Sequence, residues 1–312
     1  MSHAPVLLDE ALAGLAVRPD GYYLDATYGR GGHARAILMK LGASGRLCTV
    51  DRDPEAVASA EKAFGHDSRV HVSRGSFATL TELVPRDWVE RGFDGILFDL
   101  GVSSPQLDSA ERGFSFMQDG PLDMRMDPQS GISAAQWLAR VSERDLSRVI
   151  HELGEERFAR RIARAIVAHR RESPITRTAE LAAIVAAAVP TREPGKHPAT
   201  RTFQALRMHI NGELDSLAQA LPASLKLLTA HGRLVVISFH SLEDRAVKQF
   251  MRRHATVDPV YAGLPNIPPH VRPTLRIVGK AVKPSPAEIA ANPRARSAVL
   301  RIAERIVSGE AA

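Results

Sequence analysis

The feature of this sequence that most constrains its fold is an alternation of short apolar runs and helical stretches before residue 101. Four runs have the length and composition of buried strands, namely Tyr22–Ala26, Leu47–Asp51, Val70–Ser73 and Gly95–Leu100. Helical stretches lie between them, including Ala34–Leu41 and Pro54–Phe64. The second of these begins with the start signal Asp53-Pro54. Strands that alternate with helices predict a parallel, doubly wound α/β sheet.

The alternation stops after Leu100, and the next strand pattern is Leu234–Ser238. A βαβ unit needs only roughly 30 residues or a few more, so most of the stretch between them is extra. Its apolar residues recur at helical spacing in four segments: 142–154, 155–171, 181–188 and 203–217. Strand patterns return at Thr274–Val278 and Ala298–Ile302, after a proline-rich loop, Val257–Pro273. We therefore predict a helical domain, 109–215, inserted into a sheet domain of 1–108 and 216–312, and we disfavour a separate C-terminal domain.

A glycine-rich loop, DATYGRGGH, follows the first predicted strand and carries Gly29, Gly31 and Gly32. Glycine permits a tight turn and lets backbone N–H groups approach a ligand closely. Asp51 ends the second predicted strand, where a carboxylate would accept hydrogen bonds from both ribose hydroxyls. Together these features predict an adenosine-type cofactor and leave open which one. The G-x-G-G pattern, unlike the G-x-G-x-x-G typical of NAD, favours S-adenosylmethionine, and a glycine turn without a ligand is the alternative.

The fourth predicted strand leads directly into the polar stretch FDLGVSSPQLD, Phe98–Asp108. In open α/β sheets the chemistry lies at the carboxyl ends of the strands. Asp99, Ser103 and Ser104 offer oxygen acceptors for the N–H groups of a cytosine or adenine amine, and Pro105 would stiffen them. Methyl transfer to such a weakly nucleophilic amine depends mainly on positioning and needs no metal. The alternative for Ser103–Pro105 is an ordinary turn.

Eight stretches, in order from His3 to Arg305, carry a resemblance to a known family: HAPVLLDEAL, DATYGRGGH, VDRDPEA, GILFDLGVSSPQLDSAERGFSFMQDGPLDMRMD, GEERFARRIARAI, HPATRTFQALRMHIN, SFHSLEDRAVK and NPRARSAVLR. On these the chain resembles the RsmH (formerly MraW) family. Members of that family use S-adenosylmethionine to methylate N(4) of a cytidine in small-subunit (16S) ribosomal RNA. The resemblance implies a class I methyltransferase fold, a Rossmann-like seven-stranded sheet with an inserted helical domain that recognises the substrate.

The resemblance also implies roles for individual residues. The expected cofactor contacts are Gly31, Gly32 and His33 on the methionine side, Asp51 at the ribose, Phe77 at the adenine, and Asp99 and Gln106 near the methionine end. Asp99 is open to two assignments, since it could hold the cofactor's amino group or the substrate amine. One departure is Ser76, where the family often has asparagine, and a serine there could still cap or hydrogen-bond locally.

The formal net charge is +6, which favours a polyanionic partner. We expect four residues to contact RNA, namely Arg112, Arg125, His240 and Arg245. For His240 an equal alternative is a satisfied histidine at a helix start, with Ser241 and Asp244 as caps. The arginines of GEERFARRIARAI form either a solvated face with glutamate partners or an RNA-backbone contact, which the overall charge favours. Aromatic residues make up 5% of the chain, so we expect little base stacking.

The single cysteine, Cys48, excludes a disulfide framework and a cysteine-based metal site. The start MSHAPVLLDEALAGL lacks the basic and long apolar regions of a signal peptide. No apolar run approaches the roughly 18 residues expected of a membrane span. We therefore expect a soluble cytoplasmic protein that binds S-adenosylmethionine, no metal and no membrane. Its partner would be small-subunit ribosomal RNA or the small subunit, with a homodimer left open.

Three other functions compete with this interpretation. An NAD-dependent oxidoreductase is disfavoured by the G-x-G-G pattern. A ribosome-assembly RNA-binding factor with a vestigial cofactor site would keep the basic character without the chemistry. A DNA amine methyltransferase is chemically adjacent and differs only in the choice of substrate.

Overall fold

The computed structural model describes residues 5–191, 195, 197–257, 260–261, 268 and 271–306. The chain divides into two compact units: a sheet unit, 1–101 with 214–312, and a helical unit, 102–213. The helical unit thus begins directly after the fourth strand, earlier than the expected residue 109, and it ends at Glu213 in place of residue 215. Much of the predicted proline-rich loop, Val257–Pro273, lies outside the described residues.

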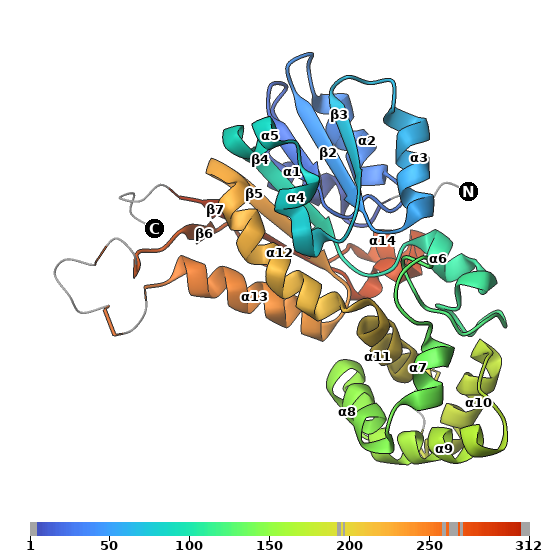
Figure 1. The fold of residues 1–312 in the computed structure, drawn as a ribbon. Helices are drawn as coiled ribbons and strands as arrows, with labels where there is room; N and C mark the ends of the chain where they lie inside the picture. The colour runs from blue at the N-terminus through green and yellow to red at the C-terminus, as the bar shows by residue number, and fades with distance from the viewer. Residues whose placement is uncertain are drawn as a thin grey trace. The chain divides into compact units, whose positions relative to one another are not determined.

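Seven strands form the sheet, in the order β3-β2-β1-β4-β5-β7-β6 (Figure 1). They are β1 Tyr22–Asp25, β2 Arg46–Asp51, β3 Val70–Arg74, β4 Phe93–Asp99, β5 Leu228–Ser238, β6 Leu275–Ile277 and β7 Val299–Arg305. Strands β1 to β5 pair in parallel, and β7 runs antiparallel between β5 and β6. All seven predicted strands are present. The seven-stranded α/β sheet expected of a class I methyltransferase is confirmed.

Helices cover both faces of this sheet (Figure 1). One face is packed by α4 Leu80–Leu83, α5 Arg86–Arg91, α12 Glu213–Leu227 and α13 Ser241–Ala255. The other is packed by α1 Leu8–Leu15, α2 Gly32–Lys40 and α3 Pro54–Phe64. Two further segments are α14 Pro286–Ala291 and the 3-10 turn η4 Pro293–Ser297. Because both faces are covered, the middle residues of the central strands are buried, which is why the sequences of these strands are mostly apolar.

Local signals explain two of the element boundaries. Helix α3 has the predicted limits, and the Asp53 carboxylate accepts a hydrogen bond from the Glu55 N–H at 3.0 Å. Strand β5 begins earlier than predicted, because the pairing of β4 with β5 shifts register between Phe93 and Gly95. The shift accommodates His231, whose backbone is left-handed with φ 62°, so this residue forms an irregularity inside the strand.

The helical unit has a core of its own. Its helices are α6 Ser104–Asp108, α7 Ala134–Arg140, α8 Glu143–Gly154, α9 Ala159–Glu172, α10 Thr178–Ala188 and α11 Thr200–Asn211, with the 3-10 turn η2 Ala110–Arg112. Buried residues such as Leu146, Ile162 and Leu206 pack together at its centre. The predicted segment 203–217 is two helices, because Gly212 adopts φ 58° and ends α11. No helix in the described ranges is long and apolar enough to cross a membrane.

Candidate cofactor-binding site

Three neighbouring strands of the sheet each end in an aspartate. Asp25, Asp51 and Asp99 are the last residues of β1, β2 and β4. Strand β1 lies between the other two and pairs in parallel with both, so the three carboxyl groups lie at one edge of the sheet. Sequence reasoning missed Asp25. Its place at the end of a strand, directly before the glycine loop, is the signal that identifies it.

The glycine loop between β1 and α2 depends on left-handed backbone conformations. Gly29 and Gly31 have φ of 55° and 70°, which favour glycine. The Gly31 N–H donates to the Tyr28 carbonyl at 2.7 Å, and α2 starts at the next residue. A Cβ added to Gly31 would lie 2.4 Å from the Tyr28 hydroxyl oxygen. The loop therefore has no room for a side chain at Gly31.

Asp51 connects this loop to the end of β2. One carboxylate oxygen accepts from the Gly29 N–H at 2.8 Å, and the other accepts from the Asp53 N–H at 2.9 Å. Each carboxylate oxygen can accept a further hydrogen bond, so the predicted ribose contact fits this geometry. Burial raises the pKa of Asp51. An additional hydrogen-bond donor would therefore stabilise the charged form of the Asp51 carboxylate.

His33 and Asp99 face one another beside the loop. The His33 side chain is 5% exposed, with Nε2 3.1 Å from the Val6 carbonyl oxygen and Nδ1 3.5 Å from Oδ2 of Asp99. A carbonyl only accepts, so Nε2 carries the hydrogen and a neutral ring directs its Nδ1 lone pair at Asp99. Burial lowers the pKa of His33 to about 4 and raises that of Asp99 well above its ordinary value. Burial therefore favours the neutral form of both groups.

Two carboxyl oxygens at this edge of the sheet lack hydrogen-bond donors among the described residues. Asp25 is 1% exposed, and within the described part of the chain its Oδ2 has no hydrogen-bond partner, as is also true of Oδ1 of Asp99. Burial, together with the nearby Asp51 carboxylate, raises the pKa of Asp25 to about 7. For Asp99, burial acts with the neighbouring Asp25 and Glu243 carboxylates. Buried carboxyl oxygens without donors fit a ligand that brings positive charge and N–H groups, and S-adenosylmethionine carries a sulfonium and an ammonium.

Phe77 stands on the turn after β3, close to the end of β2. The Gly75 N–H donates to the Asp51 carbonyl at 2.9 Å, which ties this turn to the ribose-type aspartate. The Phe77 ring packs edge-on against Phe98, with 5.8 Å between centroids. The Ser76 hydroxyl accepts from the Ala78 N–H at 3.2 Å, so the expected local bonding of this serine is confirmed.

The serine-proline stretch after β4 is a helix start. Ser103 caps α6, and its N–H donates to Oε1 of Gln106 at 3.0 Å in a capping box. Ser104 is the first residue of α6, and Pro105 lies in its first turn. The predicted turn is thus replaced by a short helix, because a serine cap followed by proline is a helix-start signal. Gln106, 5% exposed, serves this cap.

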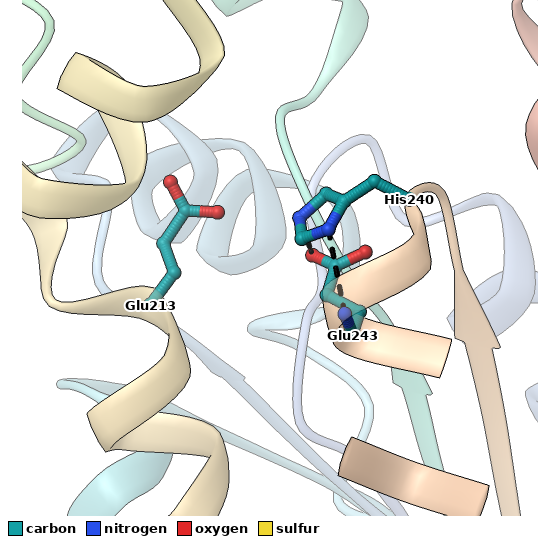
Figure 2. A group of neighbouring side chains, drawn as sticks. All are labelled: Glu213, His240 and Glu243. Atoms are coloured by element: carbon teal, nitrogen blue, oxygen red, sulfur yellow. Dashed lines mark hydrogen bonds and ion pairs between the residues drawn. The ribbon is translucent and has the colours of Figure 1, made fainter. Parts of the chain in front are cut away.

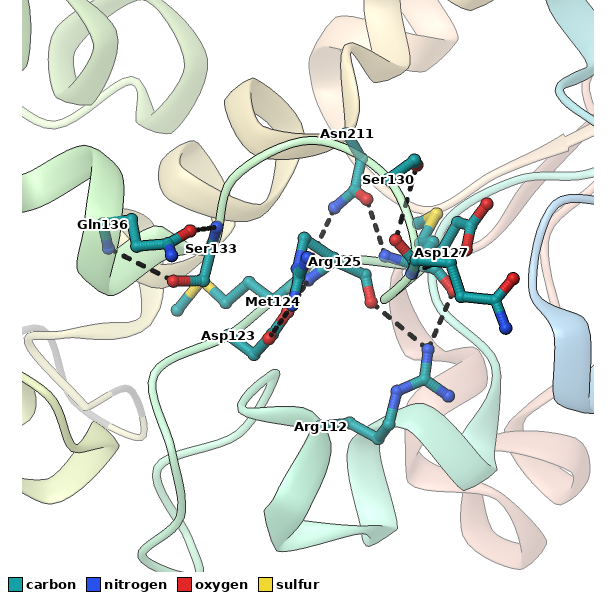
Figure 3. A network of polar contacts seen from close by, with 11 residues as sticks. Arg112, Asp123, Met124, Arg125, Asp127, Ser130, Ser133, Gln136 and Asn211 are labelled. Atoms are coloured by element: carbon teal, nitrogen blue, oxygen red, sulfur yellow. Dashed lines mark hydrogen bonds and ion pairs between the residues drawn. The ribbon is translucent and has the colours of Figure 1, made fainter.

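Arg112 and Arg125 belong to one polar network in the helical unit (Figure 3). Arg112 is 8% exposed, and its guanidinium donates to the carbonyl oxygens of Arg125 at 3.2 Å and Met126 at 2.9 Å. The Arg125 guanidinium donates to both carboxylate oxygens of Asp123, at 2.8 and 2.7 Å. These contacts give both arginines a structural role, and their predicted RNA contact stays a prediction.

His240 caps α13 with its imidazole. Its Nδ1 accepts from the Glu243 N–H at 3.4 Å, and its Nε2 lies 3.1 Å from Oε1 of Glu243 (Figure 2). The structure thus shows His240 as a helix cap, and its predicted RNA contact stays a prediction. His240 itself is the N-cap of α13, where Ser241 and Asp244 were expected as caps, and Asp244 accepts from Arg301 of β7 at 2.7 and 3.0 Å. Arg245 is exposed on α13.

Comparison with known proteins gives a match along almost the whole chain. The model of the MraW methylase family matches residues 1–306. A protein of Thioalkalivibrio sulfidiphilus named ribosomal RNA small subunit methyltransferase H is 57% identical, over 98% of this chain and 98% of its own length. A protein of the same name from Xanthomonas euvesicatoria pv. vesicatoria is 58% identical, over 99% of this chain and 90% of its own length.

Solved structures are more distant. An rRNA methylase from Streptococcus thermophilus is 10% identical, with a TM-score of 0.43, over 98% of this chain and 100% of that one. The assignment of the fold therefore rests on the strand order and strand directions of the chain itself.

Proposed function

The chain belongs to the MraW methylase family, and on that premise we propose that it transfers a methyl group from S-adenosylmethionine to the N(4) amine of a cytidine in small-subunit ribosomal RNA. The observation that carries the proposal is the set of strand-end carboxyl groups, Asp25, Asp51 and Asp99, beside the glycine loop. The relatives at 57% and 58% identity bear the name of such an enzyme.

The cofactor would lie along the edge of the sheet. Asp51 would accept its ribose hydroxyls, Phe77 would flank its adenine, and the backbone of Gly31 and Gly32 would line its methionine end. His33 and Asp99 would border that end too, with Gln106 as a further contact. When bound, the cofactor supplies an electrophilic methyl group on a positively charged sulfur. The positive charge of the cofactor would stabilise the carboxyl oxygens of Asp25 and Asp99 that lack hydrogen-bond donors within the described residues.

The chain's own contribution to the reaction would be positioning and proton acceptance. A cytosine amine conjugated with its ring must be held with its nitrogen lone pair directed at the methyl carbon. We assign this to oxygen acceptors of Asp99, Ser103 and Ser104, with Pro105 fixing the start of α6. The amine would lose a proton as it is methylated, and we assign the acceptance of that proton to the carboxylate form of Asp99.

The decisive experiment is mass spectrometry of small-subunit ribosomal RNA from cells that lack this protein. We expect N(4)-methylated cytidine to disappear and to return with the wild-type chain but not with Asp99→Ala. Persistence of every N(4)-methylated cytidine would overturn the substrate assignment. If Asp99→Ala restored the cellular role without methylation, an assembly factor with a vestigial cofactor site would be the better description. Methylated cytosine lost from DNA instead would indicate a DNA amine methyltransferase.

We infer that the partner is the ribosomal RNA, free or within the small subunit, and that the protein works in the cytoplasm where that RNA is found. A homodimer is a separate proposal. Sedimentation of the purified protein tests it, and a monomeric mass over the working concentration range would refute it.

A further inference from the structure

Helix α9 of the helical unit has one apolar face and one basic face. Its buried residues Ala159, Ile162, Ala163, Ile166 and Val167 pack in the core of that unit. At 3.6 residues per turn, the arginines Arg160, Arg161, Arg164 and Arg171 project within about 100° of one another on the opposite side. All four are exposed. The only acidic residue of the helix is its last, Glu172.

These arginines differ from several others of the helical unit in having few ion-pair partners among the residues that the structure describes. Arg160, Arg161 and Arg171 form no ion pair with any residue that the structure describes, and Arg164 lies 3.8 Å from Glu143 while it is 80% exposed. Four other arginines of the unit are paired at 2.5 to 3.2 Å, namely in Arg125–Asp123, Arg148–Asp145, Arg177–Asp119 and Arg207–Glu213. The glutamate partners considered for a solvated face are therefore largely missing from α9.

We propose that this arginine face, Arg160, Arg161, Arg164 and Arg171, binds the sugar–phosphate backbone of the substrate RNA. The proposal rests on the proposed function and adds to it the surface that holds the RNA. The face is about 16 Å long at 1.5 Å per residue, enough for several phosphates in a row. Guanidinium groups bind phosphate through paired N–H donors, and each phosphate neutralised releases condensed counterions.

The chemistry of the helix favours RNA backbone over other anionic partners. A helix that lies on a membrane must insert its apolar face among the lipids, and the apolar face of α9 is already buried in the core of its unit. The exposed face carries no aromatic residue between Arg160 and Arg171, so it offers nothing on which bases can stack. The contact would therefore be independent of sequence and would position the RNA without selecting the target nucleotide.

The test compares two double variants of the full chain that change net charge equally. R160Q/R161Q removes unpaired arginines of α9, and the control R86Q/R148Q removes exposed arginines that are paired with Glu90 and Asp145. Affinity for small-subunit ribosomal RNA is measured by fluorescence anisotropy over a series of salt concentrations. We expect R160Q/R161Q to weaken binding about tenfold at low salt and to lower the salt slope by about 2, with a much smaller change in the control.

Binding of S-adenosylmethionine and helical content should match the wild type in both variants, which verifies that they are folded. Equal weakening in the two variants would overturn the proposal, as would unchanged RNA binding by R160Q/R161Q. Binding of the wild-type chain to anionic vesicles, lost only in R160Q/R161Q, would reassign the face to membranes. If methylated cytidine vanishes in cells lacking the protein while R160Q/R161Q binds RNA normally, only the surface assignment fails. If methylation persists in those cells, the proposed function fails whatever the variants show.

Discussion

Nδ1 of His33 lies 3.5 Å from Oδ2 of Asp99, while Nε2 of the same ring lies 3.1 Å from the Val6 carbonyl oxygen. The carbonyl fixes the ring in the form that has its hydrogen on Nε2. Nδ1 is then an acceptor, and the Asp99 carboxyl opposite it is best placed when it keeps its proton. The contact between these two residues therefore makes the charge of the cofactor site dependent on pH and on cofactor binding.

The first prediction concerns Asp99 and the affinity for S-adenosylmethionine. Burial raises the pKa of Asp99, with Asp25 and Glu243 adding to the effect, so part of the cofactor-free protein holds a proton that a cationic ligand must displace. We expect affinity to rise as pH is raised above the ordinary aspartate value of 3.8 towards neutrality. Asp99→Asn should weaken binding about tenfold or more, because a hydrogen bond to a charged group contributes ~1.5–3 kcal/mol.

Calorimetry in two buffers of different ionisation enthalpy checks this prediction by counting the protons released on binding. Fewer should be released by Asp99→Asn than by the wild type. The control is Asp67→Asn, which removes a carboxylate whose pKa is already lowered to about 2 by its hydrogen bonds to Arg69. Proton release that is identical in all three proteins would contradict the assignment.

Asp25 should make stability depend on pH in the absence of cofactor. Burial raises its pKa from 3.8 to about 7, so between these values the folded state binds more protons than the unfolded state. The free energy of unfolding contributed by Asp25 therefore falls as pH rises through this range, by ~4 kcal/mol at most. His33 acts in the opposite direction, since burial lowers its pKa to about 4.

Because the two effects oppose each other, the measurement is the difference in unfolding free energy between wild type and Asp25→Asn, obtained by urea titration at several pH values. The stability of the wild type relative to the variant should decrease from pH 4 to pH 7. Parallel curves across that range would show that Asp25 ionises normally in the folded protein.

A matched pair of glycines separates steric exclusion from backbone strain. Gly31 and Gly131 have nearly equal φ, 70° and 69°, but a Cβ meets the Tyr28 side chain at Gly31 and nothing within 4 Å at Gly131. Each alanine variant should lose about 1–2 kcal/mol for the left-handed backbone. Gly31→Ala should lose more, and its cofactor affinity should fall on the order of tenfold, because the loop must shift. Thermal unfolding and calorimetry measure both, and equal behaviour of the two variants would refute the steric argument.

Asn211 joins α11 to the loop that carries Arg125. Its amide donates to the carbonyl oxygen of Met124 at 2.8 Å (Figure 3). The amide also donates to the carbonyl oxygen of Arg207 at 2.8 Å, and Oδ1 accepts from the Met126 N–H at 2.8 Å. It is 5% exposed, so Asn211→Ala leaves buried backbone groups without partners and should cost about 2–4 kcal/mol. Ser130→Ala, at an exposed site of the same network, should change stability by less than about 0.5 kcal/mol. Denaturant unfolding of both variants measures these two changes in the free energy of unfolding.

His240 offers a test of capping against substrate contact. His240→Ala should lose about 1 kcal/mol, the usual value of an N-cap. His240→Asn should retain both stability and methyl transfer, since asparagine is a good cap and the imidazole contacts Glu243 within the sheet unit. If His240→Asn is stable but inactive, the imidazole contacts the substrate. That contact is one of the two roles that the sequence suggested for His240.

Burial on both sides of the sheet is what made the strands predictable. Residues Leu47–Val50 are buried throughout because helices cover both faces, and Asp53-Pro54 marks a helix start that the structure reproduces. The end of a helix at Gly212 was harder to predict from the sequence. The apolar spacing of 203–217 continues through it, and only the left-handed φ of 58° shows that two helices meet there.

The parts of the site that a local motif fixes could be predicted from the sequence. The positions of side chains that depend on tertiary contacts were harder to predict. The glycine loop and Asp51 follow from local pattern, and the structure joins them through a hydrogen bond to Gly29. The burial of Arg112 cannot be read from a single sequence, since its partners are carbonyl groups of a loop farther along the chain. His240 was not expected as the cap itself, because imidazole is rarely an N-cap.

The position of the helical unit between β4 and β5 also sets an order of events during synthesis on the ribosome. The segment 1–101 emerges with four strands, while β5, which pairs with β4 along Gly95 to Asp99, is translated only after the entire helical unit. Domains fold as units as the chain emerges, so the helical unit can fold on its own core while β4 still presents an unpaired edge. A nascent chain that stalls before β5 is therefore the form of this protein most exposed to aggregation.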